Sequence, residues 1–173
     1  YTDEGSPGRD WNVATGMVIE GKAGFQIMGD WAKGEFTAAG KVPGVDYYCA
    51  PTPSNNGYLY NVDSFIFYKT SDPEKQEGQK LLAKLMMGKN FQKVFNLYKG
   101  SIPARLDVSM DEFDKCAKTS NSDIKTAGAS GGLVPSFAHG MAQGNTMKAA
   151  LQDVITEHFN SDMSSVDAAN ALA

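Results

Sequence analysis

The sequence predicts an α/β fold with a mixed sheet flanked by helices, on the basis of three observations. Amphipathic segments long enough for helices recur along the chain, and the clearest of them spans residues 145–159. Short apolar or aromatic runs lie between these segments, at residues 25–28, 46–50 and 58–68. Glycine or proline separates most neighbouring segments. Because helices and short strands alternate, the pattern is typical of α/β proteins.

Residues 24–36, GFQIMGDWAKGEF, stand out in the first third of the chain. Their apolar beginning, at residues 25–28, predicts a short buried strand that ends at Gly29. Asp30 and Trp31 follow directly, at the place where α/β proteins bind ligands. An indole offers a flat apolar face and a carboxylate offers two acceptors, which together suit a sugar. The alternatives are that Trp31 packs in the core and that Asp30 caps the following helix.

Helix caps, glycines and prolines predict the other elements in order. We expect helices from Asp10 to about residue 21, over 30–39, from Ser71 to Gly88, over 91–99, from a capping box at Ser109–Glu112 through Cys116, over 145–159, and from Ser164 onward. Residues 46–50 and 58–68 are the further strand candidates. Residues 119–132 predict an irregular segment with at most a helical turn, and residues 133–140 an ordered loop.

Length and charge narrow the classes of function. A chain of 173 residues is long enough to bury a core as one domain. Its net charge of −4 and its scattered basic residues argue against a nucleic-acid or anionic-lipid surface. The sequence contains no apolar stretch of membrane-spanning length and no signal peptide. The opening residues, YTDEGSPGRD, are typical of the interior of a longer protein, so a targeting segment has room upstream.

The two cysteines, Cys49 and Cys116, lie in neither a C-x-x-C pair nor a pattern with histidines at metal-ligand spacing. Two interpretations therefore remain open from the residues alone. They are two buried thiols, or one disulfide in an oxidising compartment.

Four segments carry a resemblance to a known family. They are GFQIMGDWAKGEFTAAGK, NVDSFIFYK, NLYKGSIPAR and LVPSFAHGMAQ, in this order and spacing. Together they resemble the C-terminal half of the sugar-binding proteins of bacterial ABC importers, in particular the periplasmic glucose-binding type. The resemblance extends from Arg9 to Leu172. It implies part of a two-lobed, type II periplasmic-binding-protein fold and a periplasmic or extracellular location.

The resemblance also implies an arrangement of lobes. Residues 1–50 and 105–173 would lie mainly in the second lobe. Residues 51–104 would form a hinge crossing and part of the first lobe. Cys49 and Cys116 would then lie near the returns into one lobe, which favours the disulfide. The partners implied are a monosaccharide, an ABC transporter permease and the missing N-terminal half of the protein, with no nucleic acid.

A glucose-like monosaccharide would be bound without a metal, a cofactor or any bond chemistry. The implied sugar-binding residues are two stacking indoles, one acceptor and two donors: Trp11, Trp31, Asp63, Lys99 and His139. Asp30 is expected to contact the sugar-binding side chains rather than the sugar itself. Each residue also has a structural interpretation. Trp11 could staple its helix to the core, Asp63 could belong to a turn, Lys99 could satisfy a helix C-terminus, and His139 could be a hydrogen-bonded loop histidine.

Two other classes of function remain as alternatives. A single-domain α/β hydrolase could use Cys116 and His139 as nucleophile and base, or Asp30 and Asp63 as a carboxylate pair. Against it, no G-x-S-x-G, P-loop or G-x-G-x-x-G motif occurs in a suitable context. An assembly or interaction module without a ligand would need no site at all.

Overall fold

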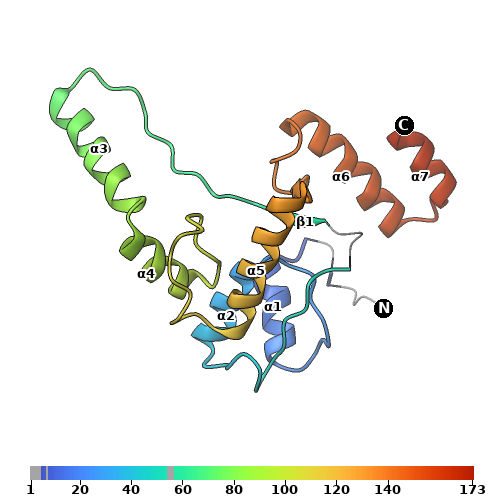
Figure 1. Cartoon of the computed structure of the whole chain (residues 1–173). Helices are drawn as coiled ribbons and strands as arrows, with labels where there is room; N and C mark the ends of the chain where they lie inside the picture. The colour runs from blue at the N-terminus through green and yellow to red at the C-terminus, as the bar shows by residue number, and fades with distance from the viewer. Residues whose placement is uncertain (1–4, 7, 54–56) are drawn as a thin grey trace. The chain divides into compact units, whose positions relative to one another are not determined.

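The computed structural model describes residues 5–6, 8–53 and 57–173, and helices dominate it (Figure 1). The elements in order are α1 (Trp11–Ile19), η1 (Asp30–Ala32), α2 (Lys33–Ala38), β1 (Tyr58–Tyr60), α3 (Pro73–Met86), α4 (Lys89–Lys99), α5 (Lys115–Ser130), β2 (Leu133–Pro135), α6 (Asn145–Asn160) and α7 (Ser165–Leu172). They form two compact units. The first comprises Tyr1–Ser54 and Ile66–Thr126, and the second comprises Asn55–Phe65 and Ala127–Ala173. Residues 1–4, 7 and 54–56 lie outside the described residues.

Side-chain caps begin several helices where the sequence predicts them. The Asp10 carboxylate accepts a hydrogen bond from the backbone N–H of Trp11 at 2.8 Å and starts α1. Asp72 accepts from the N–H of Glu74 at 2.9 Å and starts α3, with a proline at its first position. Ser164 caps α7 by accepting from the N–H of Asp167. These starts are confirmed because a cap is a local interaction.

The second unit contains a parallel pair of strands, β1 and β2. Tyr58 pairs with Leu133 and Tyr60 with Pro135. Hydrogen bonds at both ends extend the pairing, from Tyr58 N–H to the Gly132 carbonyl and from Ser136 N–H to the Tyr60 carbonyl, each at 2.8 Å. In the described part of the chain this sheet has two strands and is parallel, so an α/β class is confirmed in coarse form, whereas the mixed sheet is not seen. Helices α6 and α7 pack against each other in the same unit.

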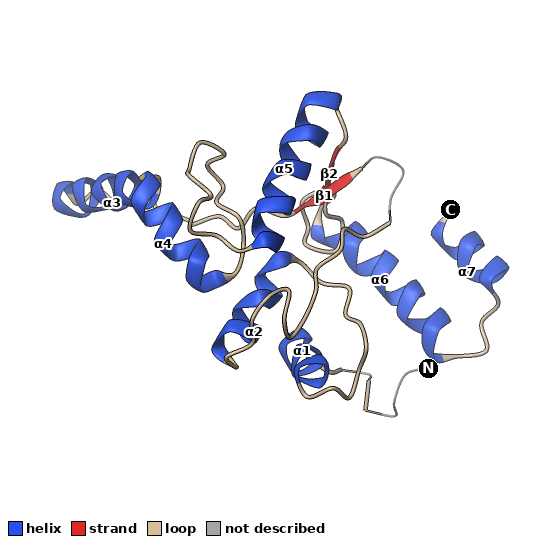
Figure 2. Cartoon of the chain, turned by 60° about the horizontal axis from the view of Figure 1, so that its bottom comes forward, coloured by secondary structure: helices blue, strands red, loops and turns tan. Residues whose placement is uncertain are grey.

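Two predicted strands are wrong for this chain. Residues 25–28 and 46–50 are loops (Figure 2), and Phe25 and Ile27 are 95% and 84% exposed rather than buried. Of the run at 58–68, three residues form β1, and the rest continues as an exposed loop into α3. A strand requires a hydrogen-bonded neighbour and a cover for its apolar face. Among the described residues, no strand runs beside either segment: Tyr47 forms only an isolated bridge with Pro43, and its ring stacks on Phe36.

Helix α5 is longer than predicted, because it includes most of the segment expected to be irregular. The capping box at Ser109–Glu112 does not start it, since the Ser109 hydroxyl is engaged with Asp111 in a turn. Asp114 caps the helix instead, accepting from the N–H of Ala117 at 2.8 Å. Ala117 and Ala127 are buried along one side of α5. Packing of these small side chains outweighs the weak helix propensity of the surrounding serines, threonines and asparagines.

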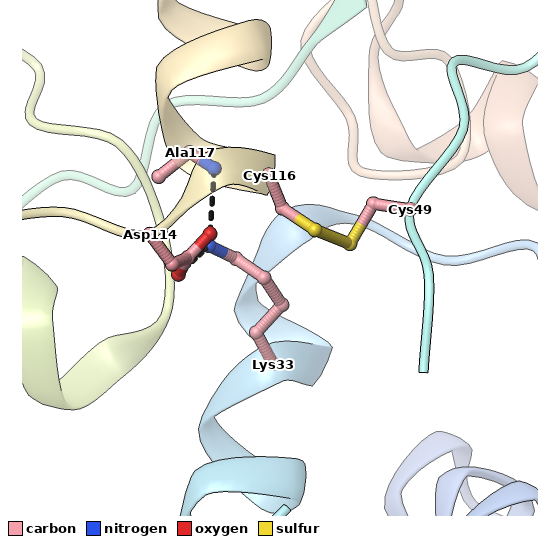
Figure 3. Close-up of a disulfide and its surroundings, with 5 residues drawn as sticks. All are labelled: Lys33, Cys49, Asp114, Cys116 and Ala117. Atoms are coloured by element: carbon pink, nitrogen blue, oxygen red, sulfur yellow. Dashed lines mark hydrogen bonds and ion pairs between the residues drawn. A yellow bond between two sulfur atoms is a disulfide. The ribbon is translucent and has the colours of Figure 1, made fainter. Parts of the chain in front are cut away.

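A disulfide and a partly buried ion pair join three segments of the first unit (Figure 3). Cys49 and Cys116 form the disulfide that the resemblance implies. Their Cα atoms lie 5.7 Å apart. Beside this bond, the ammonium group of Lys33 on α2 donates to the Asp114 carboxylate at 2.7 Å. Burial alone would raise the pKa of Asp114, but the bonds from Lys33 and from Ala117 N–H outweigh it, so the pKa is lowered. Helix α2, the start of α5 and the loop at Cys49 are thereby held together.

The disulfide makes a first prediction. Because the bond joins residues 67 positions apart, replacing both cysteines by serine is expected to lower the free energy of unfolding by about 4 kcal/mol in the chain-entropy description. Urea unfolding followed by circular dichroism measures the change, and the wild-type protein in reducing agent should match the double variant. Two thiols titrating in the denatured, unreduced protein would show that the bond is absent.

The Lys33–Asp114 pair makes a second prediction, on pH. A carboxyl whose pKa is lower in the folded than in the unfolded state stabilises the fold fully above its unfolded pKa, near 3.9, and loses this contribution as the pH falls through the folded value. At pH 6 we expect Asp114→Asn to be less stable by about 1–2 kcal/mol, because the buried ammonium loses its counter-charge. The difference should shrink below pH 4 in urea titrations. A difference that stays constant from pH 6 to pH 3 would contradict this account.

Candidate functional site

The two units divide the candidate sugar-binding residues between them. The first unit holds Trp11, Trp31 and Lys99, and the second holds Asp63 and His139. The expected set is therefore split into two parts, one in each unit.

Asp30 connects η1 to the loop that follows α4. Its carboxylate accepts a hydrogen bond from the backbone N–H of Ile102 at 2.9 Å, although 72 residues separate the two in sequence. The expected helix cap is wrong, because η1 begins after Gly29 without a side-chain cap bond. Burial raises the pKa of Asp30, and the bond from Ile102 N–H and the nearby charges of Lys33 and Lys99 offset part of the rise.

A close backbone approach fixes the end of α4 against the beginning of α2. Gly100 ends α4 with φ of 88°, in the left-handed region, and donates its N–H to the Asn96 carbonyl at 2.9 Å. A Cβ atom on Gly100 would lie 2.6 Å from the nitrogen of Gly34. A Cβ atom on Gly34 would likewise lie 2.8 Å from the carbonyl oxygen of Lys99. Both positions therefore require glycine, and the contact places Lys99 near η1.

The Trp31 ring lies over Gly29 at the turn into η1. A Cβ atom on Gly29 would overlap the six-membered ring of this indole, so glycine is required here too. Trp31 is half-buried, with part of the indole open to solvent. Lys99 is also half-buried, and its ammonium nitrogen lies 6.0 Å from the centre of the Phe95 ring. The half-buried Asp30 carboxylate thus lies next to Trp31 in the chain and close enough to the Lys99 ammonium to be affected by its charge.

Trp11, at the first position of α1, is 36% exposed and so is not a core residue in this chain. Its carbonyl accepts from the Thr15 hydroxyl at 3.0 Å and from the Gln26 side-chain amide at 3.1 Å. The second bond ties the loop containing residues 25–28 to the beginning of α1. The indole therefore has a fixed base and a partly exposed ring, as a stacking surface requires.

In the second unit, Asp63 and His139 lie on exposed loops. The Asp63 carboxylate accepts from the Asn61 side-chain amide at 3.1 Å. The Nδ1 atom of His139 is hydrogen-bonded to the Ser136 hydroxyl at 2.6 Å, and Ser136 is buried. A buried hydroxyl thereby orients an exposed imidazole. Ser136 was missed from the sequence, although the S-x-x-H spacing in a tight loop is a signal for such a bond.

Helix α4 buries two of its polar residues and exposes several of its apolar ones. Gln92 and Asn96 are buried, and Gln92 bonds to the Met86 carbonyl at 2.8 Å and to the Ala104 N–H at 3.1 Å. The side chains of Phe91, Val94, Phe95, Tyr98 and Lys99 line an open groove. We call the five residues that line this groove the α4 stripe. Tyr98 is 81% exposed. A large exposed apolar face of this kind usually marks an interaction surface.

The structure removes one basis for the hydrolase alternative. Cys116 is held in the disulfide, so it offers no thiolate to act as a nucleophile. Among the residues that the structure describes, no group of three or more His, Cys, Asp or Glu side chains is arranged to hold a metal ion. None of the described helices combines the length and the apolar character needed to cross a bilayer.

The contact between Gly34 and Gly100 makes a third prediction. Gly100→Ala should lower the free energy of unfolding by at least about 2 kcal/mol, because alanine is strained at positive φ and its Cβ would meet the α2 backbone. Gly78→Ala is the matched control. Gly78 lies inside α3 with open space around its Cα, so the change should stabilise by up to about 1 kcal/mol. Equal melting temperatures for the two variants would refute the close approach.

Comparison with curated proteins finds relatives along nearly the whole chain, while no family model matches. A probable sugar-binding periplasmic protein of Brucella suis biovar 1 (strain 1330) is 47% identical over 99% of the chain, which spans 41% of that protein. A protein of the same description from Rhizobium meliloti (strain 1021) is 44% identical over 99% of the chain and 42% of its own length. The xylose/arabinose-binding protein XacG of Haloferax volcanii is 30% identical over 76% of the chain and 28% of its own length.

These relatives agree with the family that the four sequence segments resemble. The chain spans about two fifths of the length of the bacterial relatives, so the comparison covers the chain well and those proteins in part. It extends over all the candidate residues, because 173 residues are aligned. The chain is therefore similar along nearly its whole length to probable sugar-binding periplasmic proteins, and it corresponds to about two fifths of their length.

Proposed function

We propose that this chain is the C-terminal part of a periplasmic or extracellular protein that binds a glucose-like monosaccharide and delivers it to the permease of an ABC importer. One observation carries the proposal: the similarity along 99% of the chain to proteins described as probable sugar-binding periplasmic proteins. A further relative in Pyrococcus horikoshii, 33% identical over 91% of the chain, is described as an ABC transporter extracellular-binding protein. The mechanism is reversible capture with closure of two lobes, without bond chemistry.

The chemistry of the described residues suits a neutral sugar. In the first unit, the partly exposed Trp31 offers an apolar face and Lys99 offers a charged donor close by. Trp11 adds a second partly exposed indole. In the second unit, Asp63 supplies acceptors and His139 supplies a ring held by Ser136. Each hydroxyl of a sugar enclosed by such groups can be paired, which avoids a cost of about 1–3 kcal/mol for each one left unpaired.

The lobe arrangement also belongs to this proposal. Residues 1–50 and 105–173 would form most of the second lobe, and residues 51–104 a hinge crossing with part of the first. The disulfide joins the two parts assigned to the second lobe. The sugar would then lie between the lobes.

The missing N-terminal part of the protein would cover the apolar surfaces that this chain exposes. The bacterial relatives are more than twice as long as the chain, so they contain enough sequence for that role. The α4 stripe is one such surface. The loop at residues 25–28, with its exposed Phe25 and Ile27, is another, because an added strand beside it would supply both hydrogen bonds and cover.

The proposal predicts specific sugar binding by the full-length protein. Titration with glucose, galactose, mannose, xylose and arabinose should change Trp fluorescence, with glucose or a close relative of it bound most tightly. Lys99→Met should weaken binding by about tenfold to a hundredfold, since a hydrogen bond to a charged group stabilises by about 1.5–3 kcal/mol. Lys80→Met is the matched control, because Lys80 lies on α3 in an exposed pair with Glu77 at 3.7 Å.

Several outcomes of this titration would decide against the proposal. If no sugar changes the fluorescence or melting temperature of the full-length protein, the binding function is wrong. Turnover of a substrate would favour the hydrolase alternative, and a folded oligomer that ignores sugars would favour the assembly module. If this chain alone were a compact monomer with full sugar affinity, the proposed role of the N-terminal part would be refuted.

A further inference from the structure

We propose that Asp30 is a positioning residue that sets the placement of Lys99 relative to Trp31, and so tunes sugar affinity without touching the sugar. This inference rests on the proposed function for its effect on binding. The positioning itself is a property of the first unit and is tested separately. Asp30 suits the role because it directly precedes Trp31, while its hydrogen-bond partner, Ile102, lies three residues after Lys99.

The hydrogen bond between Asp30 and Ile102 joins two segments that no interaction between sequence neighbours would align. Asp30 lies at the beginning of η1, and Ile102 lies in the loop after α4. The carboxylate oxygen accepts from the Ile102 N–H at 2.9 Å. The residues on either side of Ile102, Ser101 and Pro103, are buried, so water has little access to compete for this bond. One carboxylate thereby fixes the distance between the turn that presents Trp31 and the loop that follows Lys99.

The contact between Gly34 and Gly100 does not by itself fix the position of Lys99 relative to Trp31. Gly34 and Gly100 allow the two backbones to approach closely, but neither glycine has a side chain to set a direction. Asp30 supplies a directed bond on the other side of the same junction. The two glycines allow the backbones to approach each other, and the Asp30 hydrogen bond determines how the two segments are aligned.

Charge also links Asp30 to Lys99. The charged groups near Asp30 are the ammonium groups of Lys33 and Lys99. Lys33 is already paired with Asp114 at 2.7 Å. Lys33 has the larger electrostatic effect on the Asp30 carboxyl, and Lys99 is the second cation that this carboxylate attracts. A half-buried acid that bonds a distant backbone amide close to this lysine is well placed to orient it.

The experiment compares Asp30→Ala and Asp30→Asn in the full-length protein. Alanine removes the acceptor, whereas asparagine keeps an oxygen that can accept from the Ile102 N–H. The exposed Asp153→Asn on α6 is the control for loss of one carboxylate. Hydrogen exchange of the Ile102 amide, followed by NMR, reports the positioning without any sugar. We expect exchange to be at least about tenfold faster in Asp30→Ala and close to wild type in Asp30→Asn.

Sugar affinity then tests the consequence for binding. We expect Asp30→Ala to weaken glucose binding by about tenfold, and Asp30→Asn to recover most of that loss. In a Lys99→Met background, Asp30→Ala should cost less than about threefold, because the residue that it positions is already gone. A merely structural role would instead give the same loss in both backgrounds.

The outcomes separate this inference from the proposed function. Unchanged Ile102 exchange in Asp30→Ala would overturn the positioning role, whatever the sugar data show. Faster exchange with unchanged affinity, or with equal losses in both Lys99 backgrounds, would overturn its link to binding. Should the wild-type protein bind no sugar, the proposed function fails, and the exchange data alone decide whether Asp30 holds the junction. If Asp30→Ala does not fold, Asp30→Asn with slow Ile102 exchange but the full loss of affinity would equally overturn the inference.

Discussion

The ion pair between Lys33 and Asp114 is the contact on which the first unit depends. It binds α2 to the start of α5, and the disulfide beside it fixes the loop at Cys49 (Figure 3). Because the Lys33 ammonium is withdrawn from water, it is stabilised by the half-buried Asp114 carboxylate, and removing that carboxylate would leave a buried charge without its partner. Three residues before Lys33 lies Asp30, so the same short segment that is anchored by the ion pair also holds the loop after α4. The candidate site is an extension of this anchor.

Polar contacts, rather than an apolar core, organise much of the described chain. Helix α4 buries Gln92 and Asn96 and exposes Phe95 and Tyr98, which reverses the usual arrangement. Polar side chains with hydrogen bonds to distant backbone define a unique position, whereas exposed apolar faces remain costly until something covers them. The chain corresponds to about two fifths of its relatives' length. Its internal geometry is thus set in large part by directed bonds, and many large apolar side chains stay exposed among the described residues.

The sequence predicted what depends on neighbours in the chain and missed what depends on distant residues. The helix starts at Asp10 and Asp72 were correct, because each cap bonds to a backbone N–H one to three residues away. The strands at 25–28 and 46–50 were wrong, because a strand forms only against a partner. Asp30 had the position and chemistry of a cap, yet it bonds to Ile102, and no pattern within a few residues signals that choice. The types of side chain at the candidate site could therefore be read from the sequence. Of their supports, Ser136 has a local S-x-x-H signal that was missed, and Ile102 has none.

The division of the candidate residues between two units bears on how affinity would arise under the proposed function. Trp11, Trp31 and Lys99 belong to one unit, and Asp63 and His139 to the other. Under the proposed function, ordering each set of side chains on binding would cost free energy and reduce the observed affinity. Any part of the protein that orders these side chains beforehand would reduce this cost without contacting the sugar. The remainder of the protein would then strengthen binding through pre-organisation, in the same way that Asp30 acts on Lys99 within the first unit.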